Sequence, residues 1–210
     1  MRLNKKIIVS VVILLVVLTC GYIFFEKGIE KKSERNTLKV ENAEINDDIQ
    51  MGEMEIVYCD NDKLIFKDYY GLFIYSLETN QIINSLDVKY INCHLSQGDN
   101  VCQFKTYDNG SIIELYTENE DYYFDWDKNK LYTDYDTSKQ EEDKNDNLKV
   151  IEPRKDLENI NSYAFNYVDY NGSKLYLTCS GKEEILNNLS YVIEDESGEI
   201  IRNNYIFRKS

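Results

Sequence analysis

The chain has 210 residues, of which 42% are hydrophobic and 13% aromatic, so it holds enough apolar material for a packed core. Disorder of the whole chain is therefore excluded. Its 38 acidic residues outnumber its 24 basic ones, and the formal net charge of −14 excludes nucleic acid as an expected partner, because phosphate binding needs clustered lysine and arginine.

An apolar segment near the N-terminus predicts a transmembrane helix. Residues 7–25, IIVSVVILLVVLTCGYIFF, contain no charged residue and approach the ~20 residues that a helix needs to cross a bilayer. Arg2, Lys5 and Lys6 precede the segment, and a short positive tail normally stays in the cytoplasm. We expect residues 1–6 to form a cytoplasmic tail and residues 7–25 to be an uncleaved signal anchor of the cell membrane, with the remainder of the chain extracytoplasmic.

Residues 26–52 are rich in charge and poor in aromatic side chains, and they show no alternation of apolar and polar positions. Such a composition predicts a stalk that holds the folded part away from the membrane. Residues 137–148, TSKQEEDKNDNL, have a similar composition and predict an exposed loop. Residues 181–189, GKEEILNNL, favour one short helical turn.

The region from residue 53 to residue 210 predicts a mainly β domain of antiparallel hairpins and meanders. Short runs of β-branched and aromatic residues alternate with turn sequences such as Asp108-Asn109-Gly110. Residues 72–86, 122–135 and 191–205 each contain a strand, an acidic turn and a second strand. The first two lie ~50 residues apart, which is the period of a propeller blade. Any antiparallel hairpin has this pattern, so a propeller-like fold and a plain meander both remain open.

Cys93 and Cys102 bracket the polar turn CHLSQGDNVC. On adjacent antiparallel strands in an oxidising exterior, two such cysteines come within bonding distance, and we expect a structural disulfide. A regulatory thiol pair, or a zinc site that includes His94, is the alternative. Cys59 and Cys179 lie far apart in the sequence, and they either pair with each other or remain buried thiols.

The segment from Tyr70 to Tyr116 resembles a segment in the extracytoplasmic parts of clostridial membrane proteins, some of them related to the β-lactam sensor-transducer metallopeptidases. The matching features are Gly71-Leu72-Phe73, Tyr75, Leu77, Cys93, Gln97-Gly98-Asp99, Cys102 and Asp108 to Gly110. The segment covers less than a quarter of the chain. The resemblance implies a propeller-like accessory region and not a catalytic domain.

The catalytic motifs of that group are absent from the sequence. The peptidases carry a His-Glu-x-x-His zinc helix, whereas this chain has a single histidine, His94. A Ser-x-x-Lys motif of the β-lactam-acylating type is also missing. We therefore expect no enzyme activity, no catalytic residue and no cofactor.

One acidic stretch has the spacing of a calcium loop. Asp125, Asp127 and Asn129 occupy positions 1, 3 and 5, and Asp136 stands where the last ligand would come. Lys130, however, replaces the glycine of the sharp turn, and an acidic hairpin turn explains the same residues. This stretch is a weak calcium candidate, and we expect no resident metal.

Together these features predict a membrane-anchored extracytoplasmic domain that binds or senses an unidentified ligand without catalysis. Its expected partners are the membrane, through residues 7–25, and a protein or cell-wall component. One alternative is a cell-surface enzyme that acts on wall glycan through unassigned carboxylates. The other is an assembly partner of another membrane protein, for which an exposed apolar patch would be the sign.

Overall fold

The computed structural model describes residues 36–45, 54–95, 101–150, 166–182 and 185–208. The chain divides into two units, Met1–Thr37 and Leu38–Ser210, and the description below concerns the second. The predicted cytoplasmic tail and the predicted span at 7–25 lie outside the described residues. Within the described ranges, no helix is long and apolar enough to cross a membrane.

The strands form three sheets in which sequential strands are neighbours and every recorded pairing is antiparallel. The first sheet contains β2 (Glu55–Cys59), β3 (Lys63–Lys67), β4 (Gly71–Ser76) and β5 (Gln81–Asp87). The second contains β6 (Gln103–Tyr107), β7 (Ile112–Tyr116), β8 (Asp121–Asp125) and β9 (Lys130–Tyr132), with the two-residue β1 (Thr37–Leu38) at its edge. The third contains β10 (Leu148–Val150), β11 (Asn166–Tyr170), β12 (Ser173–Lys182), β13 (Ile185–Glu194) and β14 (Ile200–Arg208). A 3-10 helix, η1 (Thr137–Lys139), precedes β10. The expectation of a mainly β fold of antiparallel hairpins is confirmed.

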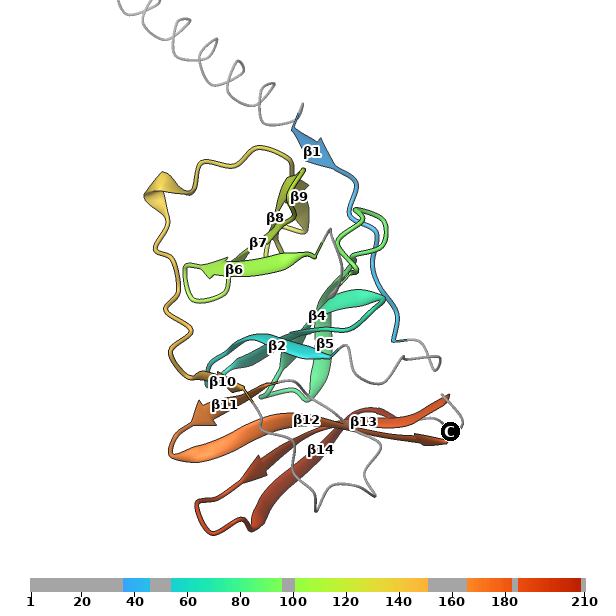
Figure 1. Ribbon diagram of the computed structural model, residues 1–210, viewed down its shortest axis with the longest axis vertical. Coiled ribbons are helices and arrows are strands. Elements are labelled where there is room, and N and C mark those ends of the chain that lie inside the picture. Colours follow the sequence, from blue (N-terminus) through green and yellow to red (C-terminus); the bar gives the residue numbers. More distant parts are fainter. Residues whose placement is uncertain (1–35, 46–53, 96–100, 151–165, 183–184, 209–210) are drawn as a thin grey trace, which may run out of the picture. The chain divides into compact units, whose positions relative to one another are not determined.

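The sheet β2–β5 lies between the other two sheets, and its strands β2, β3 and β4 are buried on both faces, whereas the first half of β5 is exposed (Figure 1). Its strands are apolar at successive positions, as in KLIFK and GLFIYS. Because successive side chains of a strand point to opposite faces, Leu64 and Phe66 enter one core and Ile65 enters the other. The first core also contains Tyr191 of β13, and the second contains Phe124 of β8. Continuous apolar runs are expected where both faces are covered.

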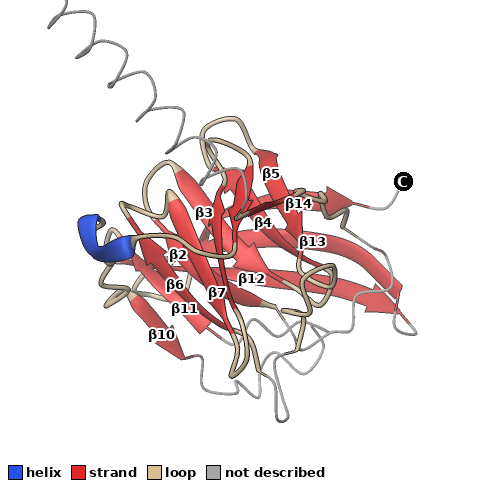
Figure 2. Cartoon of the chain, turned by 90° about the horizontal axis from the view of Figure 1, so that it is seen from above, coloured by secondary structure: helices blue, strands red, loops and turns tan. Residues whose placement is uncertain are grey.

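Asparagine residues shape several hairpin turns of the domain. Asn80 between β4 and β5, Asn129 between β8 and β9, and Asn171 between β11 and β12 all have a positive φ, from 51° to 55°. Asparagine adopts this left-handed conformation more readily than other side chains do. The hairpins expected at 72–86, 122–135 and 191–205 correspond to β4–β5, β8–β9 and β13–β14. Figure 2 shows that strands and loops make up nearly all of the described chain.

The short helical turn expected at 181–189 is wrong for the residues that the structure describes there. Those residues belong to β12 and β13, and β13 pairs with β12 on one side and with β14 on the other. The ladder with β12 runs from Ile185 to Glu194 and the ladder with β14 from Asn188 to Glu194, whereas one helical turn closes few hydrogen bonds. Pairing within the sheet therefore overrides the weak local preference.

Residues 38–45, within the predicted stalk, run beside β5. The Glu41 carbonyl accepts the N–H of Asp87 at 2.7 Å, and the Ala43 carbonyl accepts the Ser85 hydroxyl at 2.8 Å. Ala43 also lies against Gly71, where an added Cβ would come within 2.3 Å of the Ala43 Cβ. This segment therefore packs on the β domain.

Candidate functional site

A surface segment, residues 141–147, leads from η1 toward β10, and we call it the strap. Its backbone is bound to β6 and to the turn that follows β6. The N–H of Asp108 donates to the Glu141 carbonyl at 2.9 Å, and the N–H of Asp143 donates to the Thr106 carbonyl at 2.8 Å. The strap lies in the stretch 137–148 that the sequence marks as a loop, and backbone hydrogen bonds attach it to the second sheet.

The turn between β6 and β7 presents backbone N–H groups to the strap. Asp108, Asn109 and Gly110 have φ values of 54°, 57° and 72°. In this conformation the N–H groups of Asn109 and Gly110 each donate to one carboxylate oxygen of Asp143, both at 2.8 Å. The Asp108 carboxylate accepts the N–H of Glu141 at 3.0 Å. The turn and the strap thus hold each other through reciprocal carboxylate contacts.

Strand β2 supplies the opposite wall. The side-chain amides of Asn145 and Asn147 donate to the carbonyls of Val57 and Cys59, at 3.4 Å and 3.3 Å. Each asparagine therefore binds a backbone acceptor at the edge of the first sheet. The strap consequently connects β2 with β6, two strands of different sheets.

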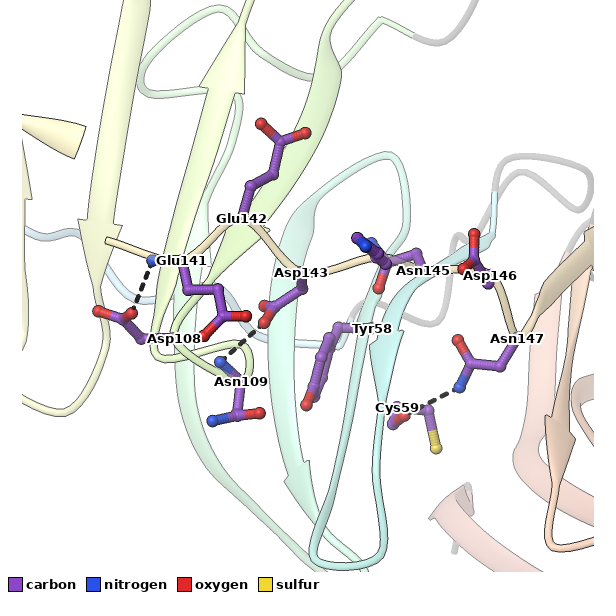
Figure 3. Close-up of a pocket in the computed structure, with 11 residues that line it drawn as sticks. Tyr58, Cys59, Asp108, Asn109, Glu141, Glu142, Asp143, Asn145, Asp146 and Asn147 are labelled. Carbon is purple, nitrogen blue, oxygen red and sulfur yellow. Dashed lines mark hydrogen bonds between the residues drawn. The ribbon is translucent and has the colours of Figure 1, made fainter. Parts of the chain in front are cut away.

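A pocket of about 550 Å³ lies between these walls (Figure 3). Five of its lining residues are acidic and one is basic, so the formal charge of the lining is 1 minus 5, or −4. The acidic residues are Asp108, Glu141, Glu142, Asp143 and Asp146, and the basic residue is Lys144. The pocket is therefore a concave surface with an excess of hydrogen-bond acceptors.

The floor of the pocket contains two groups that stay protonated at neutral pH. Burial, reinforced by the carboxylates of Asp60 and Asp143, raises the pKa of Tyr58, whose hydroxyl donates to Asp60 at 3.2 Å. Burial and the charge of Asp60 also raise the pKa of Cys59 to about 12. Because the thiolate is the nucleophilic form, Cys59 is unsuited to covalent catalysis.

Two of the acidic side chains are placed to meet a ligand. Asp143 and Asp108 already accept backbone N–H groups, and Glu142 pairs with the Lys105 ammonium at 3.9 Å, whereas Glu141 and Asp146 are exposed side chains of the lining. Carboxylates form short, strong hydrogen bonds with ammonium and guanidinium groups. The chemistry available here is thus non-covalent recognition of a cation.

The weak calcium candidate is distributed over a turn and a helix cap. Asp125 is buried, and its carboxylate accepts the backbone N–H of Lys128 at 3.1 Å and the ammonium of the same residue at 2.7 Å. Asp127 and Asn129 are exposed, and Asp136 caps η1. Within the part of the chain that the structure describes, no group of three or more His, Cys, Asp or Glu side chains is arranged to hold a metal ion.

Cys93 and Cys102 lie next to each other in the core between the first and second sheets. Their exposed fractions are 0% and 4%, and both are free thiols. A side-chain hydrogen bond with Cys93, together with burial, raises the pKa of Cys102. The structure thus places the two thiols in hydrogen-bond contact, and the disulfide itself stays a prediction. Cys59 and Cys179 are both buried in the other core.

The sequence did not single out the pocket. Its acidic residues stand in the stretch expected to be an exposed loop and in the β6–β7 turn, about 33 residues apart along the chain. The available signal was the composition of EEDKNDN together with the Asp108-Asn109-Gly110 turn. Neither feature indicates that the two segments meet.

Comparison with known proteins assigns no family. No protein-family model matches the chain, and no curated protein matches it.

Proposed function

We propose that this chain is a membrane-anchored, non-catalytic binding or sensing protein whose β domain takes up a cationic ligand outside the cell membrane. The observation that carries the proposal is the pocket beneath the strap, with five carboxylate side chains and one lysine in its lining. The ligand class that its charge favours is a basic peptide segment or an organic polyamine, because both present several ammonium or guanidinium groups.

The pocket suits binding better than reaction. Its thiol and its phenol are both held protonated, and two of its carboxylates already serve as acceptors for the backbone of the turn and the strap. A pre-formed concave surface is the usual form of a ligand site, and the polar lining of this one suits a charged ligand and not an apolar one. We therefore retain binding or sensing as the proposed role.

The sheet arrangement supports a propeller-like architecture as the scaffold. Apart from the two-residue β1, the three successive sheets are built from strands in sequential order, and the first packs against the second and the third. Propeller blades are sheets of four antiparallel strands that pack in this way. The propeller-like segment that Tyr70 to Tyr116 resembles falls largely in the first two sheets.

The binding proposal is tested with the full chain in detergent micelles and two probes, spermine and a pentalysine peptide. The pocket variant is Glu141→Gln with Asp146→Asn, since both side chains are exposed and their replacement leaves the core unchanged. The control variant is Glu118→Gln with Glu196→Gln, which removes the same charge from exposed sites elsewhere.

Titration calorimetry should give an affinity that falls about tenfold in the pocket variant, as expected when charge-assisted hydrogen bonds are lost. The control variant should lose less than about twofold, because exposed charges outside the site are screened. Equal weakening in both variants would mean that the probes bind the acidic surface in general, and absence of binding to the parent chain would refute the proposal.

The membrane orientation has its own test. Glu196 lies exposed in the turn before β14, and we propose labelling a Glu196→Cys variant with a membrane-impermeant maleimide in intact cells. Labelling of intact cells is expected, whereas a Lys5→Cys variant should label only after lysis. The reverse pattern would place the β domain in the cytoplasm and overturn the proposed location.

A further inference from the structure

Strand β14 is a long edge strand. It has nine residues, Ile200–Arg208, and stands at the end of the sheet order β10-β11-β12-β13-β14. Its recorded ladder is with β13 alone, so among the described residues no strand pairs with its other side. An edge of this length offers backbone N–H and C=O groups to another strand, and natural proteins usually shorten or block such edges.

Three apolar side chains of β14 are exposed, two at its N-terminus and one in its C-terminal half, and the polar Arg202 and Asn203 between them are exposed as well. Ile200 and Ile201 are 56% and 59% exposed, and Tyr205 is 51% exposed. The strand contains no proline, although its register with β13 shifts at Ile201 and at Ile206, so the edge is regular chiefly from Arg202 to Tyr205. A single exposed isoleucine is ordinary, whereas adjacent isoleucines and a tyrosine along an open edge are typical of a contact surface.

The edge is held in a fixed position. The Asn204 amide donates to Asn80 Oδ1 and to the Tyr191 hydroxyl, both at 2.7 Å. Ile206 and Phe207 pack against the core that the first and third sheets share. A partner strand would therefore meet a pre-organised template and would not have to order β14 on binding.

The charges around β14 select the orientation of a partner. Its C-terminal end carries Arg208, whose guanidinium lies 5.2 Å from the centre of the Tyr205 ring. Its N-terminal end follows an acidic turn that contains Asp195, Glu196 and Glu199. In an antiparallel pair of two identical strands, the basic end of each copy meets the acidic turn of the other. In a parallel pair, like charges would face each other.

We infer that β14 is a self-association surface through which two copies of this chain pair antiparallel, so that their five-stranded sheets become one continuous sheet. A two-fold axis through the middle of β14 makes the contact isologous, and the same patch serves both copies. Backbone hydrogen bonds between the two β14 strands hold the copies together, and burial of Ile200 and Ile201 away from water adds to the stability of the dimer. The inference is independent of the acidic pocket, whose residues belong to β2, the β6–β7 turn and the strap.

The test measures the protein mass of the full chain in detergent micelles by light scattering, at several concentrations and with reductant present. The disrupting variant is Ile201→Lys, which places a charge on the open edge. The matched control is Ile83→Lys on β5, where the parent isoleucine is 49% exposed. We expect the parent chain and the Ile83→Lys variant to be dimers and the Ile201→Lys variant to be a monomer with an unchanged far-UV circular dichroism spectrum, which shows that it still folds.

Charge reversal tests the orientation. Arg208→Glu should weaken the dimer about tenfold, as expected for an attractive pair replaced by a repulsive one. Adding Glu199→Arg to that variant should restore the dimer, because an antiparallel pair then regains opposite charges at both ends. A monomeric parent chain would overturn the inference, and so would equal dissociation by the lysine substitutions on β5 and β14. A dimer that Arg208→Glu weakens and Glu199→Arg fails to restore would overturn the antiparallel pairing.

Discussion

The side-chain amide of Asn166 completes both backbone hydrogen bonds of Ile56. Asn166 Oδ1 accepts the Ile56 N–H at 2.9 Å, and Asn166 Nδ2 donates to the Ile56 carbonyl at 2.7 Å. Asn166 opens β11 in the third sheet, and Ile56 lies in β2 of the first sheet. The amide therefore occupies the place of a neighbouring strand and joins two sheets.

Replacing Asn166 should destabilise the domain. Asn166→Ala removes a donor and an acceptor from partly buried backbone groups, and we expect a loss of about 2 kcal/mol in the free energy of unfolding. Asn166→Asp keeps the acceptor but places a carboxylate beside the Ile56 carbonyl, so it should be at least as damaging. Urea denaturation measures both values, with Asn203→Ala as the exposed control. Equal stability of the Asn166→Ala and control variants would show that the amide contributes nothing.

The Cys93–Cys102 pair should form a disulfide in the oxidised protein. The intact mass of the oxidised protein would then be two hydrogen atoms lower than that of the reduced protein, and reduction would restore the higher mass. Closing a ten-residue loop contributes about 2 to 3 kcal/mol in the chain-entropy model, so Cys93→Ser should lower the melting temperature of the oxidised protein. Affinity for the cationic probes should stay unchanged, because the pair lies outside the pocket. Loss of probe binding without loss of stability would contradict a purely structural role.

Glu55 should make stability depend on pH. It faces Lys67 across the β2–β3 ladder, and burial raises its pKa above 4.5 although Lys67 opposes the shift. The folded state thus holds the proton more tightly than the unfolded chain does. Stability should fall as pH rises from 4.5 through the folded pKa and remain lower above it.

A Glu55→Gln variant checks this sign, because glutamine resembles the protonated acid. We expect it to be more stable than the parent chain at pH 7, with the difference disappearing below pH 4.5, where both states of the parent are protonated. Thermal melts between those limits measure the difference. A variant that is less stable at pH 7 would mean that the attraction between Glu55 and Lys67 outweighs the cost of burial.

Gly110 should be more sensitive to substitution than Gly172, although both have a positive φ, of 72° and 79°. A Cβ at Gly110 would lie 2.7 Å from the Tyr58 ring, whereas a Cβ at Gly172 would meet no atom within 4 Å. Gly172→Ala should cost about 1 kcal/mol from backbone strain alone. Gly110→Ala should cost about 2 kcal/mol more and weaken probe binding, because the turn that holds the strap must move. Equal losses in the two variants would contradict this account of the pocket wall.

Calcium should not stabilise the β8–β9 turn. The Asp125 carboxylate is already bound to the Lys128 ammonium at 2.7 Å. We expect the melting temperature to be the same with added calcium and with a chelator. If calcium raised the melting temperature of the parent chain and not that of the Asp125→Asn variant, the turn would be a calcium site after all.

The β character of the domain was predictable because its signals are local. Runs such as KLIFK combine β-branched and aromatic side chains, and Asn80 and Asn129 stand where hairpins need a left-handed residue. The weakest local signal, which favoured a helical turn at 181–189, was overridden because β13 pairs with β12 on one side and with β14 on the other. The strap was predictable as a loop, but its hydrogen bonds to β2, to β6 and to the β6–β7 turn were not predictable.

Local sequence signals were sufficient to predict the β character of the domain, most of its hairpin turns, the acidic charge and the apolar segment at 7–25, whereas β1 lies in the stretch predicted as a stalk and β13 begins in the stretch predicted as a helical turn. Hydrophobic period and turn preference are properties of neighbouring residues, so they can be recognised in the sequence alone. Three features depend on how the sheets pack: Asp143 meets the β6–β7 turn, Asn166 contacts Ile56, and β14 lies at a sheet edge. Those contacts join residues 34 and 110 positions apart, and the packing of whole sheets against each other selects them.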